Sequence, residues 1–178
     1  MKKLLIIIIA SLAIITSAFT VSILWNIANE GVTVNFELPE EGTKGTLSGL
    51  KAMINFDQKN LVNSGMEVTM DVKTLNTGNQ QKDHHLLSAD FFNAEKYPLI
   101  TFVSSSIKTT EMGFLATGDL TIKDSTKTIE IPFTFTEEKN TGVFKGSLAI
   151  YSGDFGIMKK SNTGKDKVLV TITVPVNK

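Results

Sequence analysis

Residues 129–136 read Ile-Glu-Ile-Pro-Phe-Thr-Phe-Thr, so apolar and polar side chains alternate along this stretch. Such alternation places the apolar side chains on one face of a β-strand and the polar ones on the other. Residues 66–73, 114–122 and 168–176 alternate in the same way. We therefore predict that the chain from residue 25 onward is all-β.

Further strands are predicted at about 31–38, 44–56, 97–108 and 143–152, with turn sequences rich in Asn, Asp and Gly between them. About eight strands with mostly short connections indicate an antiparallel barrel or a sandwich. Several of these strands reach nine or more residues, which exceeds the usual five or six and favours a tall barrel.

Residues 82–94 interrupt the alternation. Asp83 is the expected N-cap of a short helical stretch that carries Leu86. Tyr97-Pro98 then returns the chain to a strand, because the residue before proline favours extended geometry. We predict a short helical crossover that covers one end of the barrel.

The N-terminal segment is strongly apolar. Lys2 and Lys3 precede an uncharged run from Leu4 to Leu24, which is long enough as a helix to cross a bilayer core. Residues 1–24 are predicted to be a cleaved signal peptide, or alternatively an uncleaved signal anchor, and residues 25–178 to be the folded domain. Either interpretation predicts a periplasmic or secreted protein, tethered to the inner membrane if the segment is not cleaved.

Composition excludes several classes of function. The 18 acidic residues balance 18 basic ones, so no nucleic-acid partner is predicted. The chain has no Cys, which excludes disulfides, thiolate metal sites and cysteine nucleophiles. It also has no Arg, so it offers no guanidinium for bidentate recognition of carboxylate or phosphate.

Catalytic and metal-binding signatures are equally sparse. His84 and His85 are the only histidines, and adjacent side chains point in different directions in a helix or a strand, so one metal cannot easily use both. We predict no metal, no cofactor and no catalysis. The less favoured alternative is an enzyme that uses His85 with Asp83 and Asp90.

Aromatic residues carry more information. Several lie on the alternating rows: Phe36, Phe56, Phe102, Phe133, Phe135 and Phe155. They fit either a packed core or an apolar lumen, because a barrel of about eight strands has an interior that side chains fill or that holds one ligand. A lumen with few polar groups would suit a lipid-like ligand.

A series of motifs resembles the YceI-like family of exported lipid-binding proteins. They are Gly45-Thr46-Leu47-Ser48-Gly49-Leu50, the alternating stretch 66–72 with Leu75-Asn76-Thr77-Gly78-Asn79, the crossover 82–92, Tyr97-Pro98-Leu99-Ile100-Thr101-Phe102, Gly118-Asp119-Leu120-Thr121-Ile122 and Asp154-Phe155-Gly156. The resemblance spans about residues 25–176. Relatives commonly have an Arg two residues before the last motif, where this chain has Ser152.

The resemblance implies an extended, eight-stranded, antiparallel, lipocalin-like barrel with a long apolar pore. It implies a non-catalytic carrier for a polyisoprenoid, an isoprenoid quinone or another long-chain amphiphile in the cell envelope. The alternative is a structural or stress-protective envelope protein with a filled barrel. A homodimer is a possible assembly, and only an uncleaved N-terminal segment would attach the protein to a membrane.

The resemblance also assigns candidate ligand-binding residues. Asp83, His85, Phe91 and Phe92 match the loop that closes over the pore. Phe102, Leu120 and Phe155 match apolar positions of the family, and Phe36, Phe56 and Phe133 join them from the alternating rows.

Overall fold

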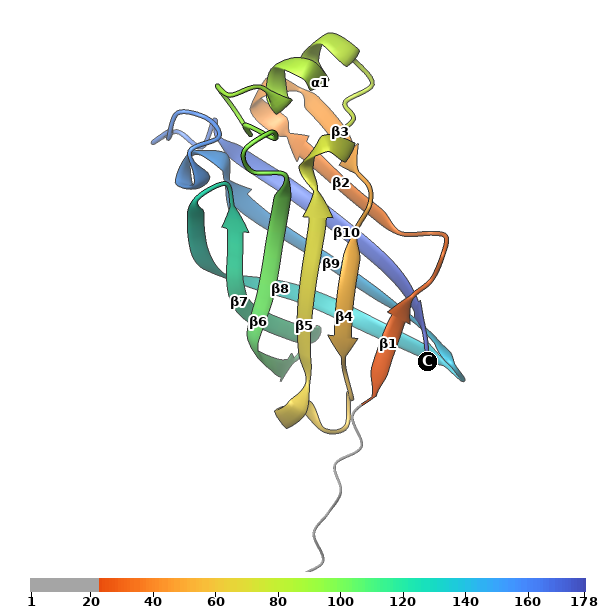
Figure 1. Ribbon diagram of the computed structural model, residues 1–178. Coiled ribbons are helices and arrows are strands. Elements are labelled where there is room, and N and C mark those ends of the chain that lie inside the picture. Colours follow the sequence, from red (N-terminus) through yellow and green to blue (C-terminus); the bar gives the residue numbers. More distant parts are fainter. Residues whose placement is uncertain (1–22) are drawn as a thin grey trace, which may run out of the picture.

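The structure is a computed structural model that describes residues 23–178 (Figure 1). The predicted signal peptide or signal anchor therefore lies outside the described residues, except for Ile23 and Leu24. Both belong to the folded domain, since Leu24 opens the first strand opposite Asn55, and Ile23 O accepts a hydrogen bond from Phe56 N. None of the helices within the described part of the chain is long and apolar enough to cross a membrane.

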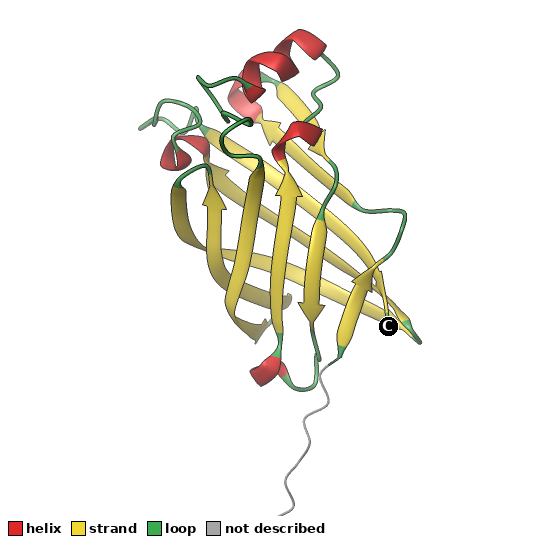
Figure 2. Ribbon diagram, in the orientation of Figure 1, coloured by secondary structure: helices red, strands yellow, loops and turns green. Residues whose placement is uncertain are grey.

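Strands joined mostly by short turns make up most of the described region (Figure 2). They are β1 (Leu24–Ile27), β2 (Thr33–Leu38), β3 (Thr43–Leu47), β4 (Lys51–Asn55), β5 (Gly65–Asp71), β6 (Leu99–Thr110), β7 (Gly113–Ile122), β8 (Ser125–Glu138), β9 (Thr141–Tyr151) and β10 (Lys167–Asn177). The α-helix is α1 (Gln80–Leu87), and the short 3₁₀ helices are η1 (Pro39–Glu41), η2 (Leu61–Asn63), η3 (Val72–Thr74) and η4 (Ser152–Phe155).

The strands form one antiparallel sheet that closes on itself. β1 pairs with β4 on one side and with β10 on the other, so the ring runs β1-β4-β5-β6-β7-β8-β9-β10 and returns to β1. The β2–β3 hairpin continues along the rest of β10. The predicted eight-stranded antiparallel barrel is confirmed, and the closure excludes the sandwich alternative.

One predicted strand is broken in two. The segment predicted at 44–56 forms β3 and β4, with a break at residues 48–50. Gly49 has a φ of 71°, a left-handed conformation that glycine adopts without steric cost and that a regular strand lacks. Ser48 N donates to Thr74 Oγ1 at 3.0 Å, so this part of the chain bonds to η3 instead of a strand. The break allows β3 to pair with β2, while β4 pairs with β1 and β5.

The predicted crossover exists and covers one end of the barrel, where α1 lies at the top of Figure 1. The prediction that Asp83 caps the helix is wrong, because Asn79 is the N-cap and its side chain accepts from Lys82 N at 3.1 Å. Asp83 lies inside the helix, where its Oδ1 accepts from the backbone N and the Oγ1 of Thr77 at 2.8 and 2.6 Å. Asp83 therefore ties the preceding loop to the helix.

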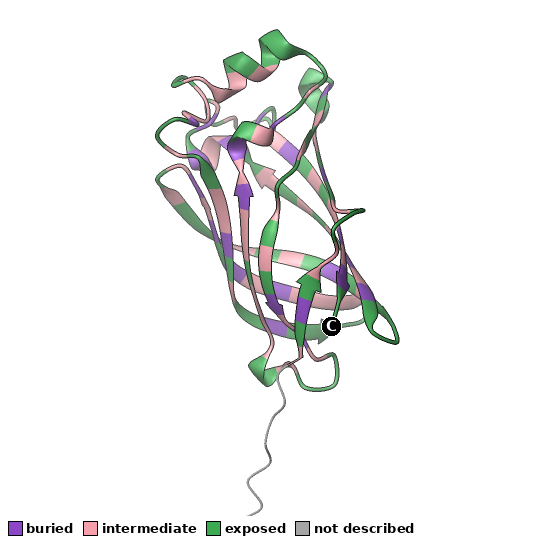
Figure 3. Ribbon diagram, turned by 45° about the vertical axis from the view of Figure 1, so that its right-hand side comes forward, coloured by how far each residue is buried: buried purple, intermediate pink, exposed green. Residues whose placement is uncertain are grey.

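Phenylalanine rings close the opposite end of the barrel. Phe56 is 1% exposed, and its ring meets four others edge-on at centroid distances of 5.0 to 5.6 Å. We call these five residues the aromatic floor: Phe56, Phe114, Phe133, Phe135 and Phe144. Trp25 packs edge-on against Phe135, and its indole Nε1 donates to Phe56 O at 2.9 Å. Figure 3 shows how buried and exposed positions alternate along the strands that carry this core.

Candidate functional site: an apolar cavity inside the barrel

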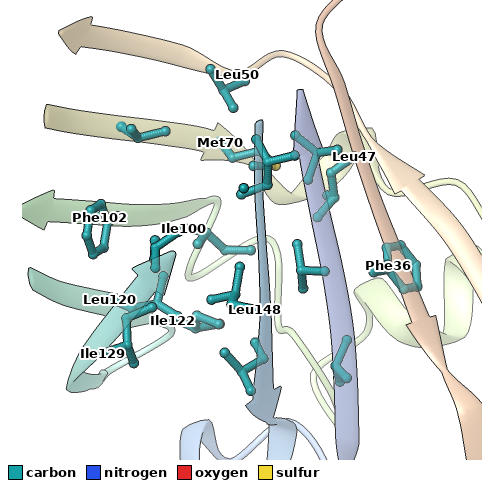
Figure 4. Close-up of a pocket in the computed structure, with 18 of the residues that line it drawn as sticks. Phe36, Leu47, Leu50, Met70, Ile100, Phe102, Leu120, Ile122, Ile129 and Leu148 are labelled. Atoms are coloured by element: carbon teal, nitrogen blue, oxygen red, sulfur yellow. The ribbon is translucent and has the colours of Figure 1, made fainter. Parts of the chain in front are cut away.

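A cavity of about 230 Å³ lies inside the barrel, above the aromatic floor. Its walls are the inward-facing rows of the strands, as the row Val168, Val170, Ile172 and Val174 on β10 illustrates. In Figure 4, Ile100, Leu120 and Leu148 converge on this space from β6, β7 and β9. The period-two pattern thus produces a lining, because every second side chain of a strand points to the same side of the sheet.

The chemistry of the lining is almost uniform. Among the described residues that line the cavity, Ser152 alone has a polar side chain. Its Oγ donates to Asp166 O at 3.1 Å, so the hydroxyl proton is already used within the wall. Water in such a space would lose most of its hydrogen bonds, whereas an alkyl chain would lose none, so the cavity favours an apolar occupant.

The end of the cavity opposite the floor is covered by the crossover. Leu86 of α1 and Phe92 of the following turn both line the cavity. The helix buries none of its residues and is held to β3 by a hydrogen bond of 2.9 Å from Lys82 Nζ to Thr43 Oγ1. Few buried contacts indicate low local stability, so we expect this end to open more readily than the floor.

The structure divides the predicted site residues into three groups. Those that line the cavity are Phe36, Phe92, Phe102, Leu120 and Phe133. Two are buried outside its lining: Phe56 in the aromatic floor and Phe155 in η4. The remaining three lie in the crossover, where Asp83 bonds to Thr77 and the rings of His85 and Phe91 meet at 4.6 Å.

Most of the lining is aliphatic and was not among the predicted site residues. Val168, Val170, Ile172 and Val174 are examples, and their alternation in the sequence was the available signal. The aromatic residues of the alternating rows thus make up only a small part of the lining.

The crossover does not assemble the residues of the enzymatic alternative. No hydrogen bond among the described residues joins the His85 ring to Asp83 or Asp90, and the bonds of Asp83 go to Thr77. Within residues 23–178, no three His, Asp or Glu side chains are placed to hold a metal ion.

One buried carboxylate lies beside Ser152. Asp166 is 1% exposed, and neither of its side-chain oxygens has a hydrogen-bond partner among the described residues. It sits against the η4 turn, where a Cβ added at Gly153 would come within 2.6 Å of Asp166 Oδ2. The nearby Lys160 ammonium donates instead to Asp154 at 2.6 Å and holds the pKa of that carboxyl below its ordinary value. The Asp166 carboxyl is thus buried without a hydrogen bond, and Lys160 interacts with it only through the longer-range attraction between the two side chains.

Replacing Asp166 with asparagine is expected to raise the free energy of unfolding by about 1–2 kcal/mol. The change replaces a buried carboxyl that accepts no hydrogen bond with a neutral amide of the same shape, which costs less to bury. Urea unfolding at neutral pH would measure the gain. Asp154→Asn is the matched control, since Asp154 has a cation partner at the surface, and we expect only a small loss of stability there. A lower stability for Asp166→Asn would contradict the interpretation.

Comparisons with known proteins agree with this architecture. The model of the YceI-like domain family matches residues 25–177. Protein YceI of Escherichia coli O17:K52:H18 is 36% identical over 101 residues, which cover 55% of this chain and 53% of that protein. The match thus spans about half the length of that relative. A UPF0312 protein of Ectopseudomonas mendocina is 30% identical over 151 residues, which cover 79% of each chain.

Solved structures share the barrel. Burkholderia cenocepacia BcnA superposes with a TM-score of 0.77 at 25% identity, covering 84% of this chain and 99% of that one. A polyisoprenoid binding domain from Saccharophagus degradans, implicated in plant cell wall breakdown, has a TM-score of 0.63 at 10% identity, covering 86% and 97%. The second likeness concerns the fold alone. The family match over nearly all of the described residues shows that this chain belongs to the YceI-like domain family.

Proposed function

We propose that this protein binds a long-chain amphiphile without catalysis and carries or sequesters it in the cell envelope. The observation that supports this function best is the 230 Å³ cavity, in whose lining Ser152 alone among residues 23–178 has a polar side chain. Ligand classes that fit are isoprenoid quinones, polyprenyl lipids and fatty amides. The solved domain that is described as binding polyisoprenoid, which shares the barrel, supports the same class of ligand.

Affinity in this proposal comes from burial of the tail. Each methylene transferred from water contributes about 0.8 kcal/mol, so a long tail binds tightly with few polar contacts. The head group stays at the end covered by α1, because Ser152 lies at that end and the aromatic floor closes the other. The cavity also counts against the alternative of a structural protein with a filled barrel.

Location in the envelope is part of the same proposal. The apolar run Leu4–Leu24 supports export, and N-terminal sequencing of the mature protein would show whether the segment is cleaved. Retention of Met1 in a cytoplasmic fraction would refute export.

Native mass spectrometry of protein purified from its own envelope tests the binding function. We expect a bound mass that disappears on organic extraction and that is recovered in the extract as a lipid with a long apolar tail. Protein stripped of lipid and then mixed with the extract should regain the same mass. If only ligand-free protein is recovered, and it has no affinity for any long-chain amphiphile, the proposed function is wrong.

A further inference from the structure

Two small residues face the cavity just above the aromatic floor. Gly146 on β9 lies opposite Phe133 of β8, and Ala116 on β7 lies opposite Ile131 of β8. Both line the cavity. A Cβ added at Gly146 would meet no atom closer than 3.4 Å, and its φ is not in the left-handed region, so the backbone does not require glycine here. A Cβ at residue 146 would therefore make ordinary contacts, and a side chain longer than that of alanine would extend into the cavity that Gly146 lines.

Below this space the cavity ends at rings. Phe133 and Phe144 line the cavity and also contact Phe56, at centroid distances of 5.6 and 5.3 Å. Trp25 covers the cluster from the outer side. All three side chains are almost completely buried, with exposed fractions of 7% for Phe133, 6% for Phe144 and 3% for Trp25. A tail that enters from the α1 end therefore meets a closed floor, and its terminal carbons reach the space beside Gly146.

The depth of the cavity follows from strand geometry. Val168 and Val174 mark its ends along β10, and the chain between them rises about 20 Å at roughly 3.3 Å per residue. Barrel strands tilt by about 35–45°, so the depth along the barrel axis is about 15 Å. One leaflet of a bilayer has the same thickness of hydrocarbon, about 15 Å.

We infer that the space beside Gly146 and Ala116 is a pocket for the end of the ligand tail, and that Phe133 and Phe144 set the greatest tail length the protein accepts. The inference rests on the proposed function and narrows it to single tails about as long as one leaflet of a bilayer is thick, about 15 Å. The excess of a much longer polyprenyl chain would remain outside the barrel.

A chain-length series measures this limit. The lipid-stripped protein is mixed with saturated primary amides from about 10 to about 24 carbons, and native mass spectrometry compares their bound fractions. Below the limit, each added methylene should raise affinity about fourfold. Beyond the limit, affinity should stay level or fall, which gives a break in the series.

Two variants should move the break in opposite directions. Gly146→Val narrows the terminal pocket and should shift the break to tails one or two carbons shorter, weakening the amide at the wild-type break about tenfold. Phe133→Leu lowers the floor and should shift the break to longer tails. Lys145→Val is the matched control, because Lys145 precedes Gly146 on β9 and faces outward, and it should leave the break unchanged. Far-UV circular dichroism would check that each variant is folded.

The outcomes separate this inference from the proposed function. Opposite shifts of the break support the inference. A wild-type series that rises without a break, or a break that Gly146→Val leaves in place, overturns it while binding itself stands. If the wild-type protein binds no amide and no other long-chain amphiphile, the proposed function fails, and the inference fails with it.

Discussion

Phe56→Ala is expected to lower the free energy of unfolding by about 3–5 kcal/mol. Phe56 is almost completely buried, and four rings surround it at 5.0 to 5.6 Å. Its removal leaves a hole lined by rigid rings that cannot collapse fully, so lost burial and an unfilled cavity add together. The backbone bonds of residue 56 to Ile23 and Trp25 remain possible, and the loss therefore reports on packing.

Urea unfolding followed by fluorescence measures this effect. Trp25 is the only tryptophan of the chain and lies 5.1 Å from the Phe135 ring, so its emission reports on the floor itself. Met112→Ala is a suitable control, because Met112 is 89% exposed and should change stability by less than about 0.5 kcal/mol. A loss below about 1 kcal/mol for Phe56→Ala would mean that the floor does not hold this end of the barrel together.

Alternation along single strands was enough to predict the barrel, because it reports which side chains share a face. It does not report where along the barrel axis a side chain lies. Phe36 and Phe56 were therefore predicted together as ligand-binding residues, although Phe36 lines the cavity and Phe56 belongs to the floor. The depth of a side chain along the barrel axis depends on the register between neighbouring strands, which places Phe133 opposite Gly146, for example. The sequence of a single strand does not determine this register.

The remaining differences between the predicted and the observed structure arise where two local conformations compete. Asp83 and Asn79 are both good N-caps, and the choice between them depends on Thr77, which bonds the Asp83 side chain from outside the helix. The break at Gly49 depends likewise on Thr74, which is distant in sequence. The cavity depends in part on small lining residues such as Gly146, whose position beside Phe133 is defined only when neighbouring strands are paired.

Ala52→Phe is expected to weaken ligand binding about a hundredfold without destabilising the domain. Ala52 on β4 lines the cavity opposite Val68 of β5, and a phenyl ring there would project into the space that the tail occupies in our proposal. Displacing three or four methylenes, at about 0.8 kcal/mol each, accounts for the loss. The same ring would bury apolar surface in an existing cavity, so the free energy of unfolding should stay level or rise by about 1 kcal/mol.

The neighbouring residue provides the control that makes this result decisive. Met53 adjoins Ala52 on β4, faces outward and is 67% exposed, so Met53→Phe adds a ring to the same strand without entering the cavity. We expect this variant to bind the amide series as the wild type does. Native mass spectrometry gives the affinities and urea unfolding the stabilities. If Ala52→Phe raises stability and loses binding while Met53→Phe does neither, the ligand binds inside the barrel. Better packing of the interior would not weaken binding at a site on the outer surface. Binding by a folded Ala52→Phe variant within about threefold of wild type would instead exclude the cavity as the ligand site, since a tail losing even one methylene already loses about fourfold.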